Sequence, residues 1–359
     1  MTTPPSKSRP VSARSLRRIV GSLLVASFAV TPIVWLGGSA QASSKTSTTT
    51  TTYKIPAGTV LNVGDQEQFL QTALTDSGAL KGAPYKVNFV EFDSGPLVNA
   101  GFAAHQIDVG FMGDLPAALA VQSGLPVKAV AAMLPIGASE FLLAKPGITS
   151  IAQLKGQTVA YTTGTAEQAF ALRALASAGL SQKDVTQVNV ALAQLGTALE
   201  SGSAVASVVS IEQKVEYQQT NPTAQVLATQ ETVKPASYDY MLATTAALNN
   251  KAKSAAIDDF TVRMIKAENW VKTHAAQYNT DYYVNLFHLT STEAEQILKA
   301  GGTYKYVPLN GSEINALQNV VDLLANAGGI PKSFNASPLF STAVSARYNA
   351  ILKANKQVG

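Results

Sequence analysis

Short apolar runs alternate with amphipathic stretches along the first two thirds of the chain. Runs rich in Val, Ile and Phe predict strands over residues 59–63, 85–92, 107–111 and 127–133. Apolar positions at helical spacing predict helices between these strands, over residues 67–77, 97–104 and 115–123. Strands that alternate with helices are typical of a mainly parallel α/β sheet. We therefore expect a first α/β lobe over residues 55–143.

A second round of the same alternation begins near residue 144. A strand over residues 141–144 is expected to leave the first lobe, and the alternation continues over residues 158–161, 166–178, 185–190, 195–201, 205–209 and 211–219. Late strands are expected over residues 226–228 and 238–244. The pattern then becomes helical, over residues 255–274, 281–287, 291–300 and 314–326. It predicts a second lobe over residues 144–243, and a return to the first lobe with C-terminal helices over residues 244–359.

The N-terminus has the pattern of a secretory signal peptide. Residues 1–42 contain five basic side chains and no acidic one, followed by an apolar run over residues 19–36 and the small-x-small sequence Ala40-Gln41-Ala42. We predict cleavage after Ala42 and export to the periplasm or the cell exterior. An uncleaved membrane anchor is the alternative, because the run is long enough to span a bilayer. Residues 43–54, rich in Ser and Thr, are predicted to be a flexible segment.

Charge and cysteine content narrow the classes of function. The formal net charge is +4, but 22 of the 27 Lys and Arg side chains remain outside residues 1–42, against 23 acidic ones. The exported body would therefore carry a net charge of −1, which argues against a nucleic-acid partner. The chain contains no cysteine, so a Cys-anchored lipoprotein, a disulfide and a thiolate metal site are all excluded.

Motifs of the common enzyme classes are missing from the sequence. It has no Gly-x-Ser-x-Gly elbow, no Gly-x-Gly-x-x-Gly loop and no phosphate-binding Gly-x-x-x-x-Gly-Lys loop. The three histidines, at positions 105, 274 and 288, are far apart and show no metal-ligand spacing. We predict a protein that is not an enzyme and that needs no metal or cofactor.

Four predicted junctions between a strand and the following helix share one composition. Each places glycine or small polar residues where the helix begins: Gln66, Ser94, Gly95, Gly113, Asp114, Thr163, Gly164 and Thr165. Backbone N–H groups at a helix start have no partner within the helix and attract anions or polar groups. In open α/β sheets such ends line a crevice. The alternative is that these residues are ordinary helix caps.

The same junctions resemble a known family. The segments Phe92-x-Ser94-Gly95-Pro96, Ile107-Asp108-Val109-Gly110, Gly113-Asp114-x-Pro116 and Leu154-Lys155-Gly156-Gln157-Thr158 resemble the nitrate/sulfonate/taurine-type substrate-binding proteins of ABC importers. The resemblance implies a type II periplasmic-binding-protein-like fold, with two α/β lobes that close on a ligand. It also implies a monomer that binds a small polar or anionic molecule, such as an aliphatic sulfonate, taurine or nitrate, and delivers it to an ABC permease.

The sequence departs from that family in one segment. An Asp-x-Trp-x-x-Trp-like segment of the family is replaced by residues 204–212, which contain no tryptophan. Glu212 is a candidate pocket residue or a solvated residue at a helix start. Tyr238, with Tyr240, would form an aromatic cleft wall or belong to the core. Asp114 would attract a ligand ammonium group or simply cap a helix.

Two other functions fit the resemblance. The first is an enzyme on the same fold, of the sulfinate desulfinase or thiamine-pyrimidine type. The second is a sensory module, whose ligand-bound lobes would signal to a membrane receptor. Turnover of a ligand would distinguish the enzyme, and the membrane partner would distinguish the sensor.

Overall fold

The computed structural model describes residues 53–137, 139–300 and 302–357. The predicted signal peptide, its cleavage after Ala42 and residues 43–52 of the Ser/Thr-rich segment lie outside the described residues. Within the described ranges, no helix is both long enough and apolar enough to cross a membrane.

The described chain alternates strands and helices up to about residue 244 and is mainly helical thereafter. The strands are β1 (Val60–Gln66), β2 (Lys86–Phe92), β3 (Val109–Met112), β4 (Val127–Ile136), β5 (Glu140–Ala144), β6 (Thr158–Ala160), β7 (Thr186–Val188), β8 (Ala206–Ser210), β9 (Gln225–Thr229), β10 (Asp239–Thr244) and β11 (Thr303–Val307). The α-helices are α1 (Phe69–Asp76), α2 (Gly95–Ala103), α3 (Asp114–Gln122), α4 (Ala166–Ser177), α5 (Leu195–Glu200), α6 (Ile211–Thr220), α7 (Thr245–Asn249), α8 (Lys251–Thr273), α9 (Ala275–Asn279), α10 (Ser291–Ala300), α11 (Ser312–Ala327) and α12 (Thr342–Ala354). A π-helical segment, Thr280–Leu286, follows α9, and single 3₁₀ turns cover Ile151–Leu154, Gln182–Asp184, Leu192–Gln194 and Ser337–Leu339.

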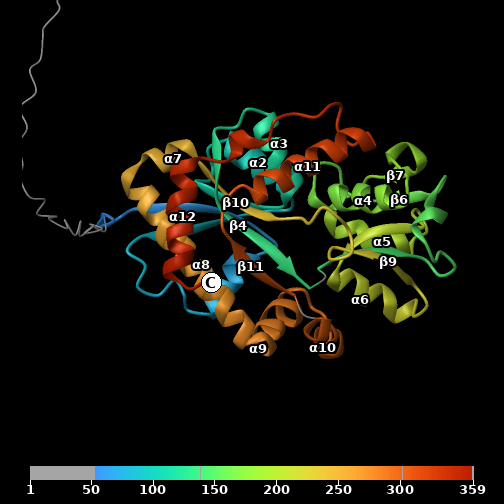
Figure 1. The fold of residues 1–359 in the computed structure, drawn as a ribbon. Coiled ribbons are helices and arrows are strands. Elements are labelled where there is room, and N and C mark those ends of the chain that lie inside the picture. The colour runs from blue at the N-terminus through green and yellow to red at the C-terminus, as the bar shows by residue number, and fades with distance from the viewer. Residues whose placement is uncertain (1–52, 138, 301, 358–359) are drawn as a thin grey trace, which may run out of the picture. The chain divides into compact units, whose positions relative to one another are not determined.

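The first sheet combines strands from both ends of the described chain. Its order is β11-β4-β10-β3-β1-β2, with β1 parallel to β2 and β3 and with β10 antiparallel to both β3 and β4. Figure 1 shows the late strands β10 and β11 beside the early strand β4. The expectation that lobe 2 extends to residue 243 is therefore corrected, because β10 already belongs to the first sheet.

Strand β11 is absent from the sequence prediction, which expected only helices after residue 247. Its sequence, Thr-Tyr-Lys-Tyr-Val, has one buried residue and lies at the edge of the sheet, antiparallel to β4. A short edge strand with a polar centre gives only a weak pattern of alternation. Its place in the sheet depends on pairing with a strand more than 160 residues earlier, which local sequence cannot reveal.

The second sheet has the order β7-β6-β8-β5-β9. Its strands β7, β6 and β8 are parallel, whereas β5 is antiparallel to β8 and β9. The sequence prediction placed residues 141–143 at the end of the first lobe, and this is corrected too. Each chain segment that crosses between the sheets thus enters its new sheet as an antiparallel strand, β5 in one direction and β10 in the other.

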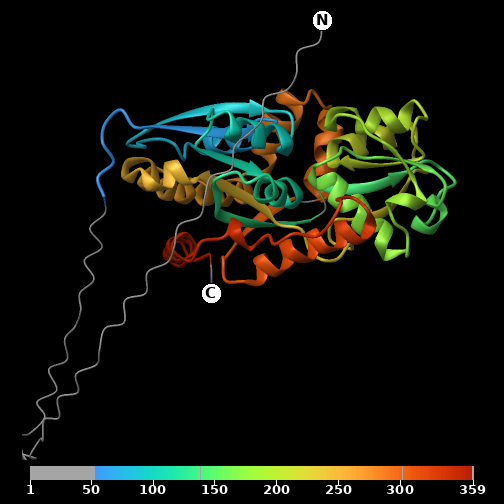
Figure 2. The ribbon, with the colours of Figure 1, turned by 90° about the horizontal axis from the view of Figure 1, so that it is seen from above.

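Helices α3 and α4 bring the two sheets into contact. Helix α3 packs on β10 of the first sheet, α4 packs on β5 and β8 of the second, and the two helices touch each other and α11. Eight of the twelve residues of α4 are buried, so this helix is covered on nearly every side. Figure 2 shows the same arrangement from above, with α11 in orange-red running along both groups of elements.

Candidate ligand-binding site

A cavity of about 180 Å³ lies between the two sheets, and we call it the intersheet cavity. From the first sheet it is lined at the ends of β1 and β3 and at the starts of α2 and α3. From the second sheet it is lined at the start of β5 and the start of α4. A molecule in this cavity would therefore touch structural elements of both sheets, at the ends where strands lead into helices.

Four of the residues predicted from the helix starts line this cavity: Gln66, Gly95, Gly113 and Thr165. The Gln66 side chain is held in place, because its Nε2 donates a hydrogen bond of 2.8 Å to the Phe111 carbonyl. A Cβ atom on Gly113 would lie 2.6 Å from the Cβ of Ala166, the first residue of α4. Glycine at this position therefore lets the starts of α3 and α4 approach each other.

The other predicted residues are not among those that line the intersheet cavity. Ser94 stands at the start of α2 and makes no side-chain cap hydrogen bond. The N–H of Thr163 donates to Asn189 Oδ1 at 2.9 Å, and the N–H of Gly164 donates to Gln168 Oε1 at 2.8 Å. Because these two amides already have partners within the protein, a ligand role for this junction remains a prediction.

Asp114 is buried behind the cavity rather than exposed to it. Its carboxylate accepts hydrogen bonds from Arg173 at 2.6 Å, from the Ser237 hydroxyl at 2.9 Å and from the Leu115 N–H at 2.7 Å. Asp114 is only 1% exposed and Arg173 2%. The carboxylate thus joins α3, α4 and the segment that leads into β10. Of the two alternatives that the sequence left open, a simple helix cap is too little, because Asp114 also binds Arg173 and Ser237; a contact with a ligand ammonium group stays a prediction.

Glu212 and Tyr238 are also not among the residues that line the intersheet cavity, although each is close to one that does. Burial raises the pKa of Glu212, and Glu212 in turn contributes to the raised pKa of Glu67 in the cavity wall. Tyr238 packs against the hydrophobic core, and Tyr240 is fully buried, with its hydroxyl donating to the Glu313 carbonyl at 3.3 Å. The sequence left open whether this tyrosine pair forms an aromatic cleft wall or belongs to the core, and in the structure both tyrosines pack against the core.

Carboxyl groups dominate the polar part of the cavity wall. The acidic residues that line it are Glu67, Asp93, Glu140, Glu167 and Asp239. No Lys, Arg or His is found among the described residues around it. Glu140 is the first residue of β5 and Asp239 the first of β10, so each crossing segment delivers one carboxyl group to the cavity. The sequence analysis missed both, because neither lies at a strand-to-helix junction.

Burial changes the acidity of these carboxyl groups. It raises the pKa of Asp239 to about 8, helped by the nearby negative charge of Asp114. Burial also raises the pKa of Glu140 well above its usual value, with a further contribution from Glu167, whose own pKa burial raises as well. Each carboxyl group makes ionisation of its neighbours less favourable, because like charges repel strongly where water is scarce.

Aromatic rings form another part of the wall, supplied by Phe69, Phe111, Tyr282 and Tyr304. Phe69 stacks on Phe111 with ring centroids 5.5 Å apart, and its ring also meets the edge of Tyr304 at 5.4 Å. The site therefore has aromatic side chains even though residues 204–212 contain no tryptophan. These rings come from the start of α1, from β3 and from the C-terminal part of the chain. Only the fold brings these segments together.

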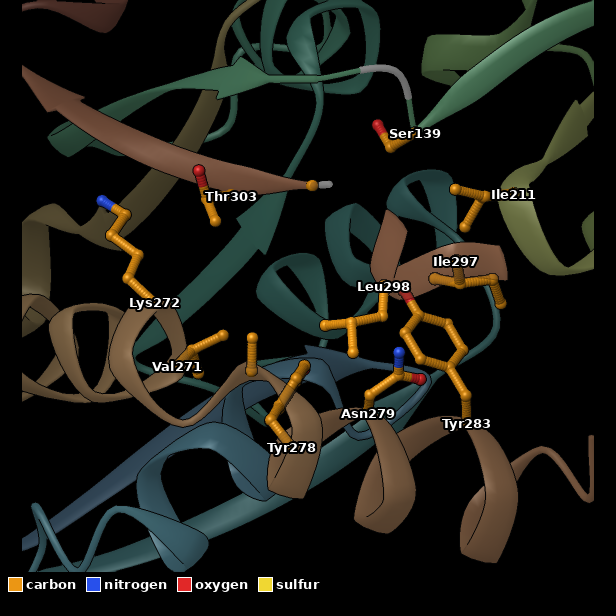
Figure 3. A pocket seen from close by; sticks show the side chains of 12 residues that line it. Ser139, Ile211, Val271, Lys272, Tyr278, Asn279, Tyr283, Ile297, Leu298 and Thr303 are labelled. Atoms are coloured by element: carbon orange, nitrogen blue, oxygen red, sulfur yellow. The ribbon is translucent and has the colours of Figure 1, made fainter. Parts of the chain in front are cut away.

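A second cavity, of about 170 Å³, is mainly apolar and is lined largely by the C-terminal helices (Figure 3). Figure 3 shows Ile297, Leu298 and Tyr283 gathered around it. We call it the helical cavity. The charged group at its edge, Lys272, donates through Nζ to the Tyr304 carbonyl at 2.6 Å. None of the residues predicted from the helix starts lines this cavity, so the intersheet cavity is the candidate ligand-binding site.

Two mixed α/β sheets with a cavity between them define the class of periplasmic-binding-protein-like folds. Within that class, the sequence model of the family described as NMT1/THI5 like matches residues 85–274, more than half of the chain. The protein therefore belongs to the NMT1/THI5-like family. The predicted fold class is confirmed, and so is the resemblance to the substrate-binding proteins of this type.

Individual relatives agree with this assignment. The chain is 30% identical over 148 residues to an Escherichia coli (strain K12) protein named as an aliphatic sulfonates-binding protein, and this match spans 40% of the chain and 46% of that relative. The alkanesulfonate-binding protein SsuA from Xanthomonas axonopodis pv. citri, bound to MOPS, superposes with a TM-score of 0.70 at 21% identity, over 80% of this chain and 99% of that one. The desulfurization enzyme DszB superposes with a TM-score of 0.59 at 12% identity, over 83% and 99% of the two chains.

Proposed function

We propose that this protein is an exported solute-binding protein that holds one small molecule in the intersheet cavity and delivers it to an ABC permease in the membrane. The observation that carries the proposal is the composition of the cavity wall, which takes residues from the strand ends of both sheets. A ligand that contacts both sheets stabilises the arrangement in which they lie close together. A permease can distinguish that arrangement from the open one.

The signal-like N-terminus supports export of the mature chain, which would act as a monomer. Its basic stretch, apolar run and Ala40-Gln41-Ala42 sequence are those of a cleaved leader. Two of the relatives named above, from Escherichia coli and Xanthomonas axonopodis, bind sulfonates according to their names, which supports a small polar solute for this chain as well.

The ligand classes expected from the sequence are aliphatic sulfonates, taurine and nitrate. Sulfonate and nitrate groups would be bound by backbone N–H groups near Gly95 and Gly113, since no basic side chain lines the described part of the cavity wall. Taurine differs from the other two because it also carries an ammonium group, which the cavity carboxylates would accept. Among these three classes, taurine fits the acidic wall best.

A catalytic role on the same fold has less support. The chain has no cysteine to act as a nucleophile. No histidine is found among the described residues that line the intersheet cavity. A sensory role would use the same binding and closure and would differ only in the membrane partner.

A ligand screen on the mature protein, residues 43–359, tests the proposal. Sulfonates, nitrate, amines and pyrimidines would be compared by thermal shift, because a ligand that binds only the folded state raises the melting temperature. Hits would then be titrated into the wild type and into Ala166→Phe, which fills the intersheet cavity. Ala343→Phe, on the exposed face of α12, is the matched control.

We expect binding to the wild type and to Ala343→Phe, and weakened binding to Ala166→Phe. A melting temperature that no compound raises would count against a solute-binding function. Equal affinity for Ala166→Phe and the wild type would place the ligand elsewhere in the protein.

A further inference from the structure

The intersheet cavity has a strongly one-sided charge. Five carboxyl groups line it, and the described residues around it include no basic side chain. The nearest buried guanidinium, that of Arg173, contacts Asp114 at 2.6 Å, so its charge is already neutralised by a carboxylate outside the cavity wall. An anion in this cavity would meet several carboxyl groups and no positive side chain.

Two of these carboxyl groups, those of Glu140 and Asp239, have no cationic partner among the described residues. Glu140 Oε2 is buried and has no hydrogen-bond partner in the described protein. Asp239 is 9% exposed and lines the cavity; a hydrogen bond with Tyr304 acts on its pKa, but it takes part in no ion pair within the described residues. A buried polar atom without a partner costs free energy, and an unpaired buried carboxylate costs more. Such atoms in a cavity wall indicate a missing donor, and the donor that suits a carboxylate best is a cation.

The aromatic part of the wall would contribute to binding the same kind of ligand. The ring centroids of Phe69, Phe111 and Tyr304 lie 5.4–6.3 Å from one another, with Tyr304 edge-to-face with the other two rings. An aromatic face attracts a cation through its negative quadrupole, and cages that combine aromatic rings with carboxylates bind ammonium ligands. The two features come from different elements and favour the same ligand charge.

We propose, building on the solute-binding function above, that the ligand presents a cationic nitrogen to Glu140 and Asp239. The nitrogen is a primary ammonium, a guanidinium or a protonated heterocycle, and the aromatic wall packs against the adjoining carbon atoms. The cavity volume of about 180 Å³ limits the ligand to a small molecule. The ligand charge in this protein is therefore opposite to that of the sulfonates in the names of its relatives.

The pH dependence of binding follows from the groups that face Asp239. These are Asp114 from α3, Glu167 and Arg173 from α4, Glu140 from β5 and Tyr304 from β11. The pKa of about 8 means that the empty site holds a proton on this carboxyl at neutral pH. A cationic ligand displaces that proton, so its affinity rises with pH, by about tenfold per pH unit for one released proton below the pKa. The affinity of an anion would instead rise as the pH falls.

Calorimetric titrations with matched compounds test the inference. The probes are taurine, isethionate (the same sulfonate with a hydroxyl in place of the ammonium), 1,4-diaminobutane and agmatine. They are titrated at pH 6.5 and 7.5 in phosphate buffer, which avoids amines and sulfonates. The variants are Glu140→Gln and Asp239→Asn. Glu295→Gln, whose side chain is exposed on α10, is the matched control.

We expect at least one amine to bind more tightly than isethionate and to bind more tightly at pH 7.5. Glu140→Gln and Asp239→Asn should each weaken the binding of this amine about tenfold or more, whereas Glu295→Gln should not. If isethionate binds better than every amine, or if affinity rises as the pH falls, the inference is wrong while the solute-binding function stands. If no compound of either charge binds, or raises the melting temperature in the wider screen, the solute-binding function itself is contradicted.

Discussion

Asp239 shows how a single residue acquires its properties from the fold. It begins β10, where the chain returns from the second sheet, and its carboxyl lies in a cavity wall with Glu140 and Glu167. In the sequence it is an acidic residue next to Tyr240, with nothing to mark it. Gln66, Gly95, Gly113 and Thr165 were predictable because a strand followed by small polar residues is a local signal. The pairing of Glu140 with Asp239 was not predictable, because these residues are 99 positions apart and are brought together by the two segments that cross between the sheets.

The first prediction concerns the pH dependence of stability in the ligand-free protein. The pKa of Asp239 is raised from 3.8 to about 8, so the folded state binds more protons than the unfolded state between these values. The free energy of unfolding should therefore fall as the pH rises through that window, by up to about 1.4 kcal/mol per pH unit for one such group. Asp239→Asn should make this decline shallower, as measured by urea unfolding at pH 6 and pH 8.

The control for that measurement is Glu295→Gln, which removes an exposed carboxyl group and should leave the slope unchanged. Some decline should persist in Asp239→Asn, because burial also raises the pKa of Glu140. If Asp239→Asn and the wild type lose stability equally between the two pH values, Asp239 does not hold a proton in the folded protein.

At the scale of elements, the contact between α3 and α4 is one link between the two sheets near the site, and α11 contacts both helices. The sequence predicted both helices, and it predicted that glycine starts one of them. It could not predict that Gly113 faces Ala166, or that Asp114 pairs with Arg173, because each pair joins two different lobes. The sequence predicted that the chain leaves the first lobe near residues 141–144 and returns to it near residue 244. It did not predict that β5 pairs in the second sheet and β10 in the first, since an apolar strand pattern does not say which sheet buries it.

The second prediction concerns the contact between the starts of α3 and α4. Gly113→Ala places a Cβ where Ala166 Cβ would be only 2.6 Å away, so the starts of α3 and α4 must separate. Overpacking of this kind costs about 1–3 kcal/mol, and we expect ligand affinity to fall about tenfold or more. Gly302→Ala, which meets nothing within 4 Å and lies beside the helical cavity, should bind as the wild type does. Calorimetric titration of both variants with a ligand found in the screen provides the measurement.

The third prediction concerns the buried ion pair between the same helices. Arg173→Met leaves the Asp114 carboxylate buried without its cation, and removing one partner of such a pair costs about 3–5 kcal/mol. The double variant Asp114→Asn/Arg173→Met should recover part of this loss, because no unpaired charge remains. Urea unfolding measures both. A loss of less than about 1 kcal/mol in Arg173→Met would mean that the ion pair contributes little to holding the sheets together.

On the scale of the whole molecule, the sequence predicted the fold class correctly. Alternating strands and helices, together with the family resemblance, are compatible with few architectures. The charge of the ligand could not be predicted from the sequence. It depends on which side chains line the cavity, and these come from α1, β3, β5, β10 and β11. A resemblance to sulfonate-binding proteins favoured an anion, whereas the carboxyl groups that line the cavity favour a cation. A shared fold thus does not determine the chemistry of the site.

The fourth prediction concerns closure. A ligand that touches both sheets favours the arrangement in which they lie close together, so the radius of gyration of the mature protein should decrease on binding. Small-angle X-ray scattering with and without saturating ligand measures this change. Ala166→Phe, which fills the cavity, should show no decrease at the same ligand concentration. An unchanged radius in the wild type, with binding established by titration, would contradict the hinge mechanism.

The most direct test of the proposed site is a crystal structure of the mature protein with the amine that binds most tightly. We expect electron density for the ligand in the intersheet cavity, with its nitrogen within hydrogen-bond distance of Glu140 or Asp239 and its carbon atoms against Phe69 and Tyr304. Density for the ligand in the helical cavity, or a nitrogen that points away from both carboxyl groups, would contradict the site that we propose.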